Sequence, residues 1–254
     1  MIFYFSATGN CKYVAQRLAE ATKDHIISIT DCMRDQLFSF SVPKNECIGI
    51  LSPTYAWGLP TIVSDFLKQL QLCGEEPAYT YFVATYGTTP GQTGRFANEQ
   101  LCAKNADIDA FFGVKMPDTW TPTFDLSNLE KVSTINAKAE AEIEAVAQSV
   151  CQRKHGDFMK FKMPYWVCKH FAGGAYEGMR KTSHFVLEDT CIGCGLCANK
   201  CPVGAIQMQD GHPVWVKEQC VMCLGCLHRC PKFAIQYDKR TKKHGQYHNP
   251  HVKI

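Results

Sequence analysis

The sequence predicts an α/β protein with a doubly wound parallel sheet of five strands, followed by a small, cysteine-rich α+β domain. Three observations support this prediction. Strand-like and helix-like apolar patterns alternate through residues 1–154, which is typical of a parallel sheet covered by helices on both faces. Eight of the fifteen cysteines fall within residues 191–230. Residues 185–210 and 214–239 repeat each other.

The expected elements follow from local patterns in chain order. Five apolar or β-branched runs are the expected strands: Ile2–Phe5, His25–Thr30, Cys47–Leu51, Thr80–Thr85 and Ile108–Val114. Three segments between them have helical periodicity: Cys11–Ala21, Thr61–Leu72 and Arg95–Lys104. A long helix is expected after Ser127 and Glu130, because their spacing matches a capping box, in which both side chains bond free backbone N–H groups.

These patterns divide the chain into three parts. Residues 1–154 form the first domain, residues 155–184 a helical connector, and residues 185–254 the second domain with a basic tail. The tail from 239 to 254 is expected to be a solvated terminus. The start of the chain lacks the pattern of a signal peptide, and no apolar run approaches the roughly 18 residues of a membrane span. We therefore expect a cytoplasmic protein without a membrane span.

Charge is divided unequally between the two halves. Residues 1–154 hold 13 basic and 17 acidic side chains, whereas residues 155–254 hold 14 and 7. The opposite signs suit two domains that attract each other, and they equally suit a docking face for an acidic partner. We expect no nucleic-acid partner, although a basic tail of this kind is the feature through which one would bind.

Each repeat carries the run Cys-x-x-Cys-x-x-Cys-x-x-x-Cys-Pro. The cysteines are Cys191, Cys194, Cys197 and Cys201 in the first run, and Cys220, Cys223, Cys226 and Cys230 in the second. Clustered cysteines in a cytoplasmic chain indicate metal rather than disulfides. Zinc sites use pairs of Cys-x-x-Cys separated by longer loops, so a third cysteine and a Cys-Pro step argue against zinc.

This run is typical of [4Fe-4S] binding, in which the fourth cysteine ligates the cluster of the other repeat. The sequence therefore predicts two clusters with crossed ligands. The first would be held by Cys191, Cys194, Cys197 and Cys230, and the second by Cys220, Cys223, Cys226 and Cys201. The segment 185–254 is similar to a bacterial two-cluster ferredoxin, which implies electron transfer.

An anion site is expected in the loop after the first strand, at Ser6, Thr8, Gly9, Asn10 and Cys11. Hydroxyls and backbone amides at the start of a helix bind anions, and the glycines of a dinucleotide fingerprint are missing. The alternative is a plain strand–helix turn. The loop resembles the phosphate loop of flavodoxins, written Thr/Ser-x-Thr-Gly-Asn-Thr. Cys11 stands where that family has a hydroxyl, so only its backbone amide remains for phosphate.

Two further loops follow the third and fourth expected strands. They contain Pro53, Thr54, Tyr55, Trp57 and Gly58, and then Thr85, Tyr86 and Gly87. In a doubly wound sheet both loops lie at the edge where such folds bind ligands. The resemblance to flavodoxins implies FMN with Trp57 and Tyr86 stacked on its ring. FAD is not expected, because the sequence shows no adenosine-binding element. The alternative is that Trp57 and Tyr55 are ordinary core or interface aromatics.

The whole chain resembles a flavodoxin-like domain fused to a two-cluster ferredoxin, a family found in anaerobes. This implies an electron-transfer protein that passes electrons between FMN and the clusters, and on to a redox partner protein that the sequence does not identify. The alternative is a reductase of a small molecule, such as a quinone or nitro compound, fed by the clusters. Direct oxidation of NAD(P)H is not expected without a nicotinamide fingerprint. No residue is assigned a catalytic role, because the cofactors carry the chemistry.

Overall fold

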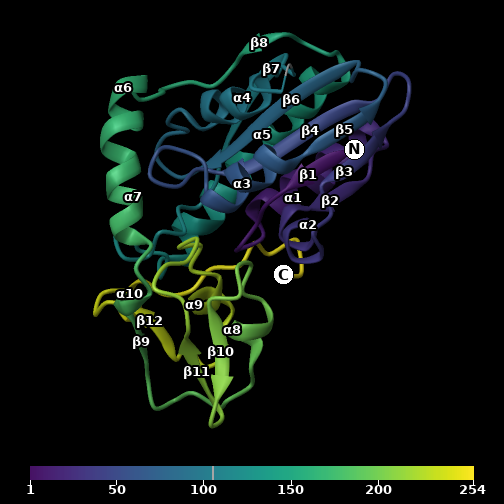
Figure 1. Cartoon of the computed structure of the whole chain (residues 1–254). Coiled ribbons are helices and arrows are strands. Elements are labelled where there is room, and N and C mark those ends of the chain that lie inside the picture. Colours follow the sequence, from purple (N-terminus) through teal and green to yellow (C-terminus); the bar gives the residue numbers. More distant parts are fainter. Residues whose placement is uncertain (105) are drawn as a thin grey trace.

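The computed structural model describes residues 1–104 and 106–254, without the side chains of residues 171 and 172. It shows a larger α/β part and a smaller part that holds the cysteine runs, with a helical rod beside both (Figure 1). Within the described residues, no helix combines the length and the apolar character that crossing a membrane requires.

The larger part is built on a parallel sheet with the strand order β2-β1-β4-β6-β7-β8. The strands are β1 (Ile2–Tyr4), β2 (Ile26–Ser28), β4 (Cys47–Pro53), β6 (Tyr79–Tyr86), β7 (Ala110–Lys115) and β8 (Gly156–Asp157). The first five of these in chain order are the five predicted strands. They are wound 2-1-3-4-5, the order of flavodoxin-like sheets. The predicted fold class is therefore confirmed.

The prediction of five strands was wrong by one. β8 pairs with β7 from within the expected connector, through Ala110–Gly156 and Phe111–Asp157. Two residues are too few to show an alternating pattern, so the sequence carries no signal for this strand. A separate parallel pair, β3 (Ser39–Val42) and β5 (Gln71–Gly74), was also not predicted.

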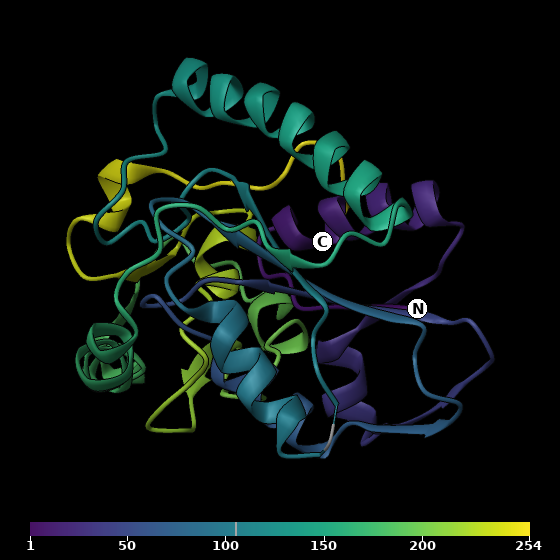
Figure 2. The same ribbon diagram turned by 90° about the horizontal axis from the view of Figure 1, so that it is seen from above.

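Helices cover both faces of the sheet (Figure 2). α1 (Asn10–Thr22) and α5 (Leu129–Cys151) pack on one face. α2 (Ile29–Asp35), α3 (Thr61–Gln69) and α4 (Thr93–Cys102) pack on the other. Each face buries its own apolar cluster, so the sheet has a hydrophobic core on both sides. The cap of α5 differs from the prediction, because the side chain of Asn128, and not that of Ser127, accepts a bond from the Lys131 amide at 2.9 Å.

The connector is helical over most of its length. α6 (Tyr165–Val167), the π-helical turn η1 (Cys168–Ala172) and α7 (Gly173–Met179) form the rod seen beside both parts in Figure 1. A 3₁₀ turn η2 (Thr182–His184) then leads into the smaller part. The rod contributes the buried Tyr176 to the core of that part.

The smaller part reflects the internal repeat. β9 (Phe185–Leu187) pairs with β12 (Ile235–Tyr237), and β10 (Ile206–Gln209) pairs with β11 (His212–Trp215). α8 (Leu196–Asn199) lies in the first cysteine run and α9 (Gly225–Arg229) in the second. Each run therefore combines a cysteine loop with a short helix, as equivalent halves of a repeat should.

The C-terminal tail is not solvated as expected. After α10 (Thr241–His244) the chain returns to the larger part, and Tyr247 and Asn249 are buried there. The Asn249 amide donates to the Thr8 carbonyl at 2.8 Å. Charge and histidine content alone gave no indication of this contact, because it depends on where the smaller part places the chain.

Candidate functional site

The predicted anion loop joins β1 to α1. Thr8 and Asn10 are 5% and 8% exposed, and the Gly9 amide donates to the Ser6 hydroxyl at 3.2 Å. Gly9 has a φ of 98°, and a Cβ there would lie 2.8 Å from Val252. Glycine is therefore required both by the backbone angle and by the packed tail.

Cys11 faces inward, and its Sγ lies 3.0 Å from the Thr85 hydroxyl. Burial raises the pKa of this thiol to about 12, so it is a neutral group at physiological pH. It joins the first turn of α1 to the end of β6 as a small buried contact and offers no ionised sulfur.

The second loop is a tight turn after β4. Tyr55 and Gly58 exchange two backbone hydrogen bonds of 2.9 Å, and Ala56 and Trp57 both have positive φ. Positive φ at both central residues is the geometry of a type I′ turn. The turn leaves Trp57 37% exposed, so its ring is held at a cavity and not in the core.

These loops surround one cavity of about 690 Å³, which we call the flavin cavity. Its wall contains eleven of the predicted cofactor-binding residues: Ser6, Thr8, Asn10, Cys11, Pro53, Thr54, Tyr55, Trp57, Thr85, Tyr86 and Gly87. Gly9 and Gly58, the remaining two, shape their loops without lining it. A pocket bounded by loops at the carboxyl ends of β1, β4 and β6 is where a doubly wound sheet binds its ligand.

The cavity also has walls that the sequence did not predict. One is the loop after β7, which contributes among others Met116, Asp118, Trp120 and Phe124. Its position at the same sheet edge was a usable signal. Asp118 lies so close to Gly87 that a Cβ there would stand 2.2 Å from the carboxylate. Burial raises the pKa of Asp118.

The cysteines of the two runs lie in two crossed sets. Cys191, Cys194 and Cys197 line one small cavity with Cys230, which we call set 1. Cys220, Cys223 and Cys226 line another with Cys201, which we call set 2. The structure thus brings together the cysteines in the two groups that the spacing predicts. Among the described residues, no group of three or more His, Cys, Asp or Glu side chains is suited to a single metal ion.

Backbone amides point at the sulfurs of these sets. The amides of Ala205, Met222 and Ala234 donate to Cys201, Cys220 and Cys230, each at 3.2 Å. Such bonds stabilise thiolates and tune a cluster's potential. Burial, followed by the charge of Cys223, raises the pKa of the Cys220 thiol to about 12, so bound iron would have to supply the positive charge that ionises it. The donor set therefore fits an iron–sulfur cluster.

The flavin cavity and set 2 share a wall. Cys223 and Leu224 line both cavities, and burial followed by the nearby Cys223 raises the pKa of Tyr55 well above its usual value. No sequence signal could have shown this wall, because it forms only where two domains meet.

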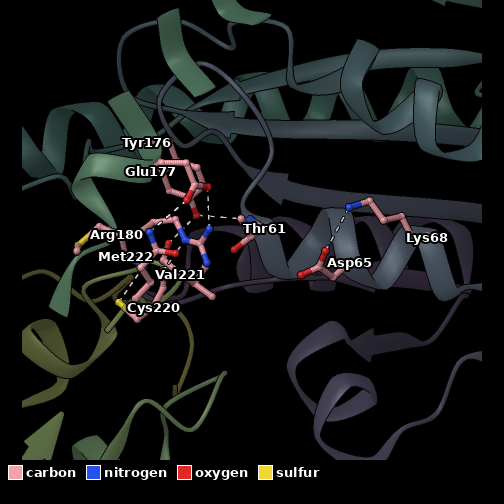
Figure 3. Close-up of polar contacts among 10 residues, drawn as sticks. Thr61, Asp65, Lys68, Tyr176, Glu177, Arg180, Cys220, Val221 and Met222 are labelled. Carbon is pink, nitrogen blue, oxygen red and sulfur yellow. Dashed lines mark hydrogen bonds and ion pairs between the residues drawn. The ribbon is translucent and has the colours of Figure 1, made fainter. Parts of the chain in front are cut away.

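Tyr176 ties the two parts together at this wall (Figure 3). Its hydroxyl donates to the Val221 carbonyl at 2.7 Å and accepts from the Thr61 amide at 3.4 Å. One turn later, Arg180 Nε donates to the Cys220 carbonyl at 2.8 Å. The rod thereby holds the segment from Cys220 to Val221 against the first turn of α3.

The tail completes the enclosure of the anion loop. The Tyr247 hydroxyl donates to Asn10 Oδ1 at 2.8 Å, and Asn249 Nδ2 donates to the same oxygen at 3.2 Å.

His228 of the smaller part anchors the tail. Burial lowers the pKa of His228 to about 4, so its ring is neutral. His228 Nδ1 accepts from the Tyr247 amide at 3.2 Å, which leaves Nε2 to donate to the Thr119 carbonyl at 2.9 Å.

A flavin-type cavity that shares a wall with clustered cysteines defines a class of flavin and iron–sulfur electron-transfer proteins. Comparison with known families agrees: the chain belongs to the flavodoxin domain family, which matches residues 1–145. Residues 184–231 match the 4Fe-4S dicluster domain. The predicted fusion of a flavodoxin domain to a ferredoxin is therefore confirmed.

Two similar ferredoxins agree with the second match. An uncharacterized ferredoxin of Methanocaldococcus jannaschii is 35% identical over 81 residues, which cover 29% of this chain and 46% of that protein. A ferredoxin of Clostridium butyricum is 54% identical over 26 residues, 10% of this chain and 47% of that protein. The chain thus spans about half the length of these relatives. Rubredoxin:oxygen oxidoreductase from the anaerobe Desulfovibrio gigas aligns over 59% of this chain and 36% of its own, with 17% identity and a TM-score of 0.34.

Proposed function

We propose that the chain holds FMN in the flavin cavity and a [4Fe-4S] cluster in each cysteine set, and that it passes electrons between them and on to a redox partner protein. The observation that carries the proposal is the position of Cys223, which lines both the flavin cavity and set 2. A flavin exchanges one or two electrons and a cluster exchanges one. The two kinds of site would therefore connect two-electron and one-electron carriers.

The residues of the chain have distinct tasks in this function. The loop from Ser6 to Cys11 presents amides and hydroxyls for the FMN phosphate, and Trp57 and Tyr86 border the space for the ring. Set 2 borders the same space. Among the described residues, no cysteine of set 1 lines the flavin cavity, and Cys194 is exposed. Set 1 is therefore the site farther from the flavin.

Cofactor content is the first test. Anaerobically purified protein should contain about 8 iron and 8 labile sulfide per chain, as two cubane clusters require, and extraction should release FMN. One zinc ion without sulfide would refute the proposal. Weaker binding of both FMN and riboflavin by equal factors after Thr8→Ala would show that the loop does not contact phosphate, since only FMN carries one.

Crossed ligation is tested by exchanging one cysteine at a time. Cys201→Ala should damage the cluster of set 2, and Cys230→Ala that of set 1, although each residue belongs to the other run in sequence. EPR spectra of the reduced variants distinguish the two clusters. If each variant lost the cluster of its own run, the proposed ligand sets would be wrong.

Electron exchange is tested by rapid photoreduction of the clusters. Flavin reduction should follow at a rate independent of protein concentration, because both sites lie in one chain. A rate proportional to concentration would mean exchange between molecules.

The second candidate is the reductase, favoured by the apolar wall that Trp120, Phe124 and Met179 add to the cavity. Turnover of a quinone or nitro compound with reduced ferredoxin as donor would select it.

A further inference from the structure

A second cleft lies between the two parts of the molecule, separate from the interior of the flavin cavity. It measures about 1000 Å³, and we call it the basic cleft. On the larger part it is lined by the anion loop, the start of α2 and the start of α3. On the smaller part it is lined by the segments 198–204 and 217–221.

Cationic side chains dominate this cleft. It contains six of them: Lys12, Arg34, Arg180, Lys200, Lys217 and Arg229. Among the described residues that line it, only two side chains are acidic, and both are already paired. Asp31 lies 2.8 Å from Arg34, and Asp65 lies 3.4 Å from Lys68 (Figure 3).

Four of the cations have no counter-charge. Arg34 and Arg180 pair with neighbouring carboxylates, but within the described residues no ion pair reaches Lys12, Lys200, Lys217 or Arg229. Lys12 and Lys217 donate only to backbone carbonyls, which leaves their charge in place. The cleft therefore carries a net positive potential that attracts anions.

Arg229 adds an unsatisfied donor. Its Nε is buried and has no hydrogen-bond partner among the described residues. The side chain folds over Gly225, where a Cβ would lie 2.8 Å from Nη1. A buried N–H without an acceptor is costly. Burial raises the pKa of the nearby Cys223, and the charge of this guanidinium acts on the same thiol to lower it.

The cleft also reaches the metal-binding segment. Cys201, Cys220 and Cys223 line it, which are three of the four cysteines of set 2. A molecule seated in the cleft would thus contact the same cysteine set that borders the flavin cavity. Anion attraction and access to a redox site coincide at one surface.

We propose that the basic cleft docks an acidic electron-carrier protein, which exchanges one electron with the cluster of set 2. This inference rests on the proposed function. In each encounter one electron passes from the reduced carrier to the oxidised cluster, or back, and no bond forms or breaks. A protein fits better than a small anion because the unpaired cations are spread over both parts of the molecule, with Lys200 and Lys217 exposed. Complementary charge of this kind accelerates association and orients the partner.

The test reverses charge at the cleft in the full, cofactor-loaded chain. Lys200→Glu with Lys217→Glu is compared with Lys131→Glu and Lys138→Glu on the exposed side of α5, which changes the net charge equally. The probe is an acidic ferredoxin, titrated in its oxidised form for binding and in its reduced form for rate. We expect the cleft variant to associate at least about tenfold more slowly at low salt, with a weaker salt dependence, since steering raises association rates by about 10- to 1000-fold. Equal losses in both variants would overturn the proposal.

Two further measurements keep the outcomes apart. Lys200→Glu alone, matched with Lys138→Glu, repeats the test without disturbing the hydrogen bond from Lys217 to Val203. Failure of flavin–cluster exchange within the chain, with carrier binding intact and sensitive to Lys200, would refute the proposed function and leave the docking surface supported. Normal exchange with carrier binding insensitive to Lys200 would refute the docking surface. Inhibition by inorganic phosphate as strong as that by polyglutamate would show a small-anion site and overturn the protein partner.

Discussion

Removing the Tyr176 hydroxyl tests whether the rod fixes the wall between the flavin cavity and set 2. Tyr176 is 8% exposed, and Tyr176→Phe deletes its bonds with the Val221 carbonyl and the Thr61 amide while keeping the ring. The stronger bond, at 2.7 Å, is the main loss. A buried polar group left without its partner costs about 1–3 kcal/mol.

The loss should be visible as reduced thermal stability. For a chain of this size, each kcal/mol lowers the unfolding midpoint by about 2–4 °C, so we expect a decrease of about 2–12 °C by anaerobic calorimetry of the loaded protein. The flavin–cluster exchange rate should fall as well, because the Cys220–Val221 segment loses one of its anchors. Tyr165→Phe on the same rod is the matched control, since its hydroxyl forms no hydrogen bond that the structure records among the described residues. Equal midpoints and rates in the two variants would refute the reasoning.

Three other perturbations have clear expected outcomes. Gly87→Ala should greatly weaken flavin binding, because its Cβ would stand 2.2 Å from Asp118, whereas Gly174→Ala on the rod, with nothing within 4 Å, should bind normally; equal affinities by flavin titration would contradict this. Cys11 should resist iodoacetamide at pH 8 in the folded protein and react after unfolding, because a pKa raised from 9.0 to about 12 lowers its thiolate fraction about 1000-fold; peptide mapping that finds it modified in the folded state would show that it is accessible. Asn249→Ala removes the side-chain bond to the anion loop and should weaken FMN binding by about two- to tenfold, the equivalent of about 0.5–1.5 kcal/mol, with a smaller effect on riboflavin binding. An equal effect on both ligands would show that the tail does not support phosphate binding by the loop.

Local signals account for most of the fold that was predicted. The five predicted strands and the three predicted helices between them have clear apolar patterns, so their order along the chain could be predicted from sequence. Elements without such a period were missed or displaced. β8 has only two residues, Gly156 and Asp157, and α2 begins at Ile29, inside an expected strand, because the Ser28 side chain caps it by accepting from the Asp31 amide.

The chemistry of the candidate site was largely present in the sequence. Cysteine spacing is a local property of the chain, and so are the hydroxyls and the glycine of the anion loop, because each motif holds its ligands within a few residues. The grouping of Cys230 with the first run also follows from the motif. These features could be predicted because short segments carry their own geometry.

The contacts between the two parts were decided only by the tertiary structure. Cys223 meets the flavin cavity, the tail reaches Asn10, and Arg229 faces the basic cleft only after both domains have folded and docked. Such contacts join residues that lie far apart in the chain, 237 positions in the case of Tyr247 and Asn10, and they leave no period or spacing in the sequence. The sequence by itself thus determined the two kinds of site, the anion loop and the paired cysteine runs, whereas the packing of one domain on the other decided which cysteine set lies beside the flavin cavity and where the basic cleft opens.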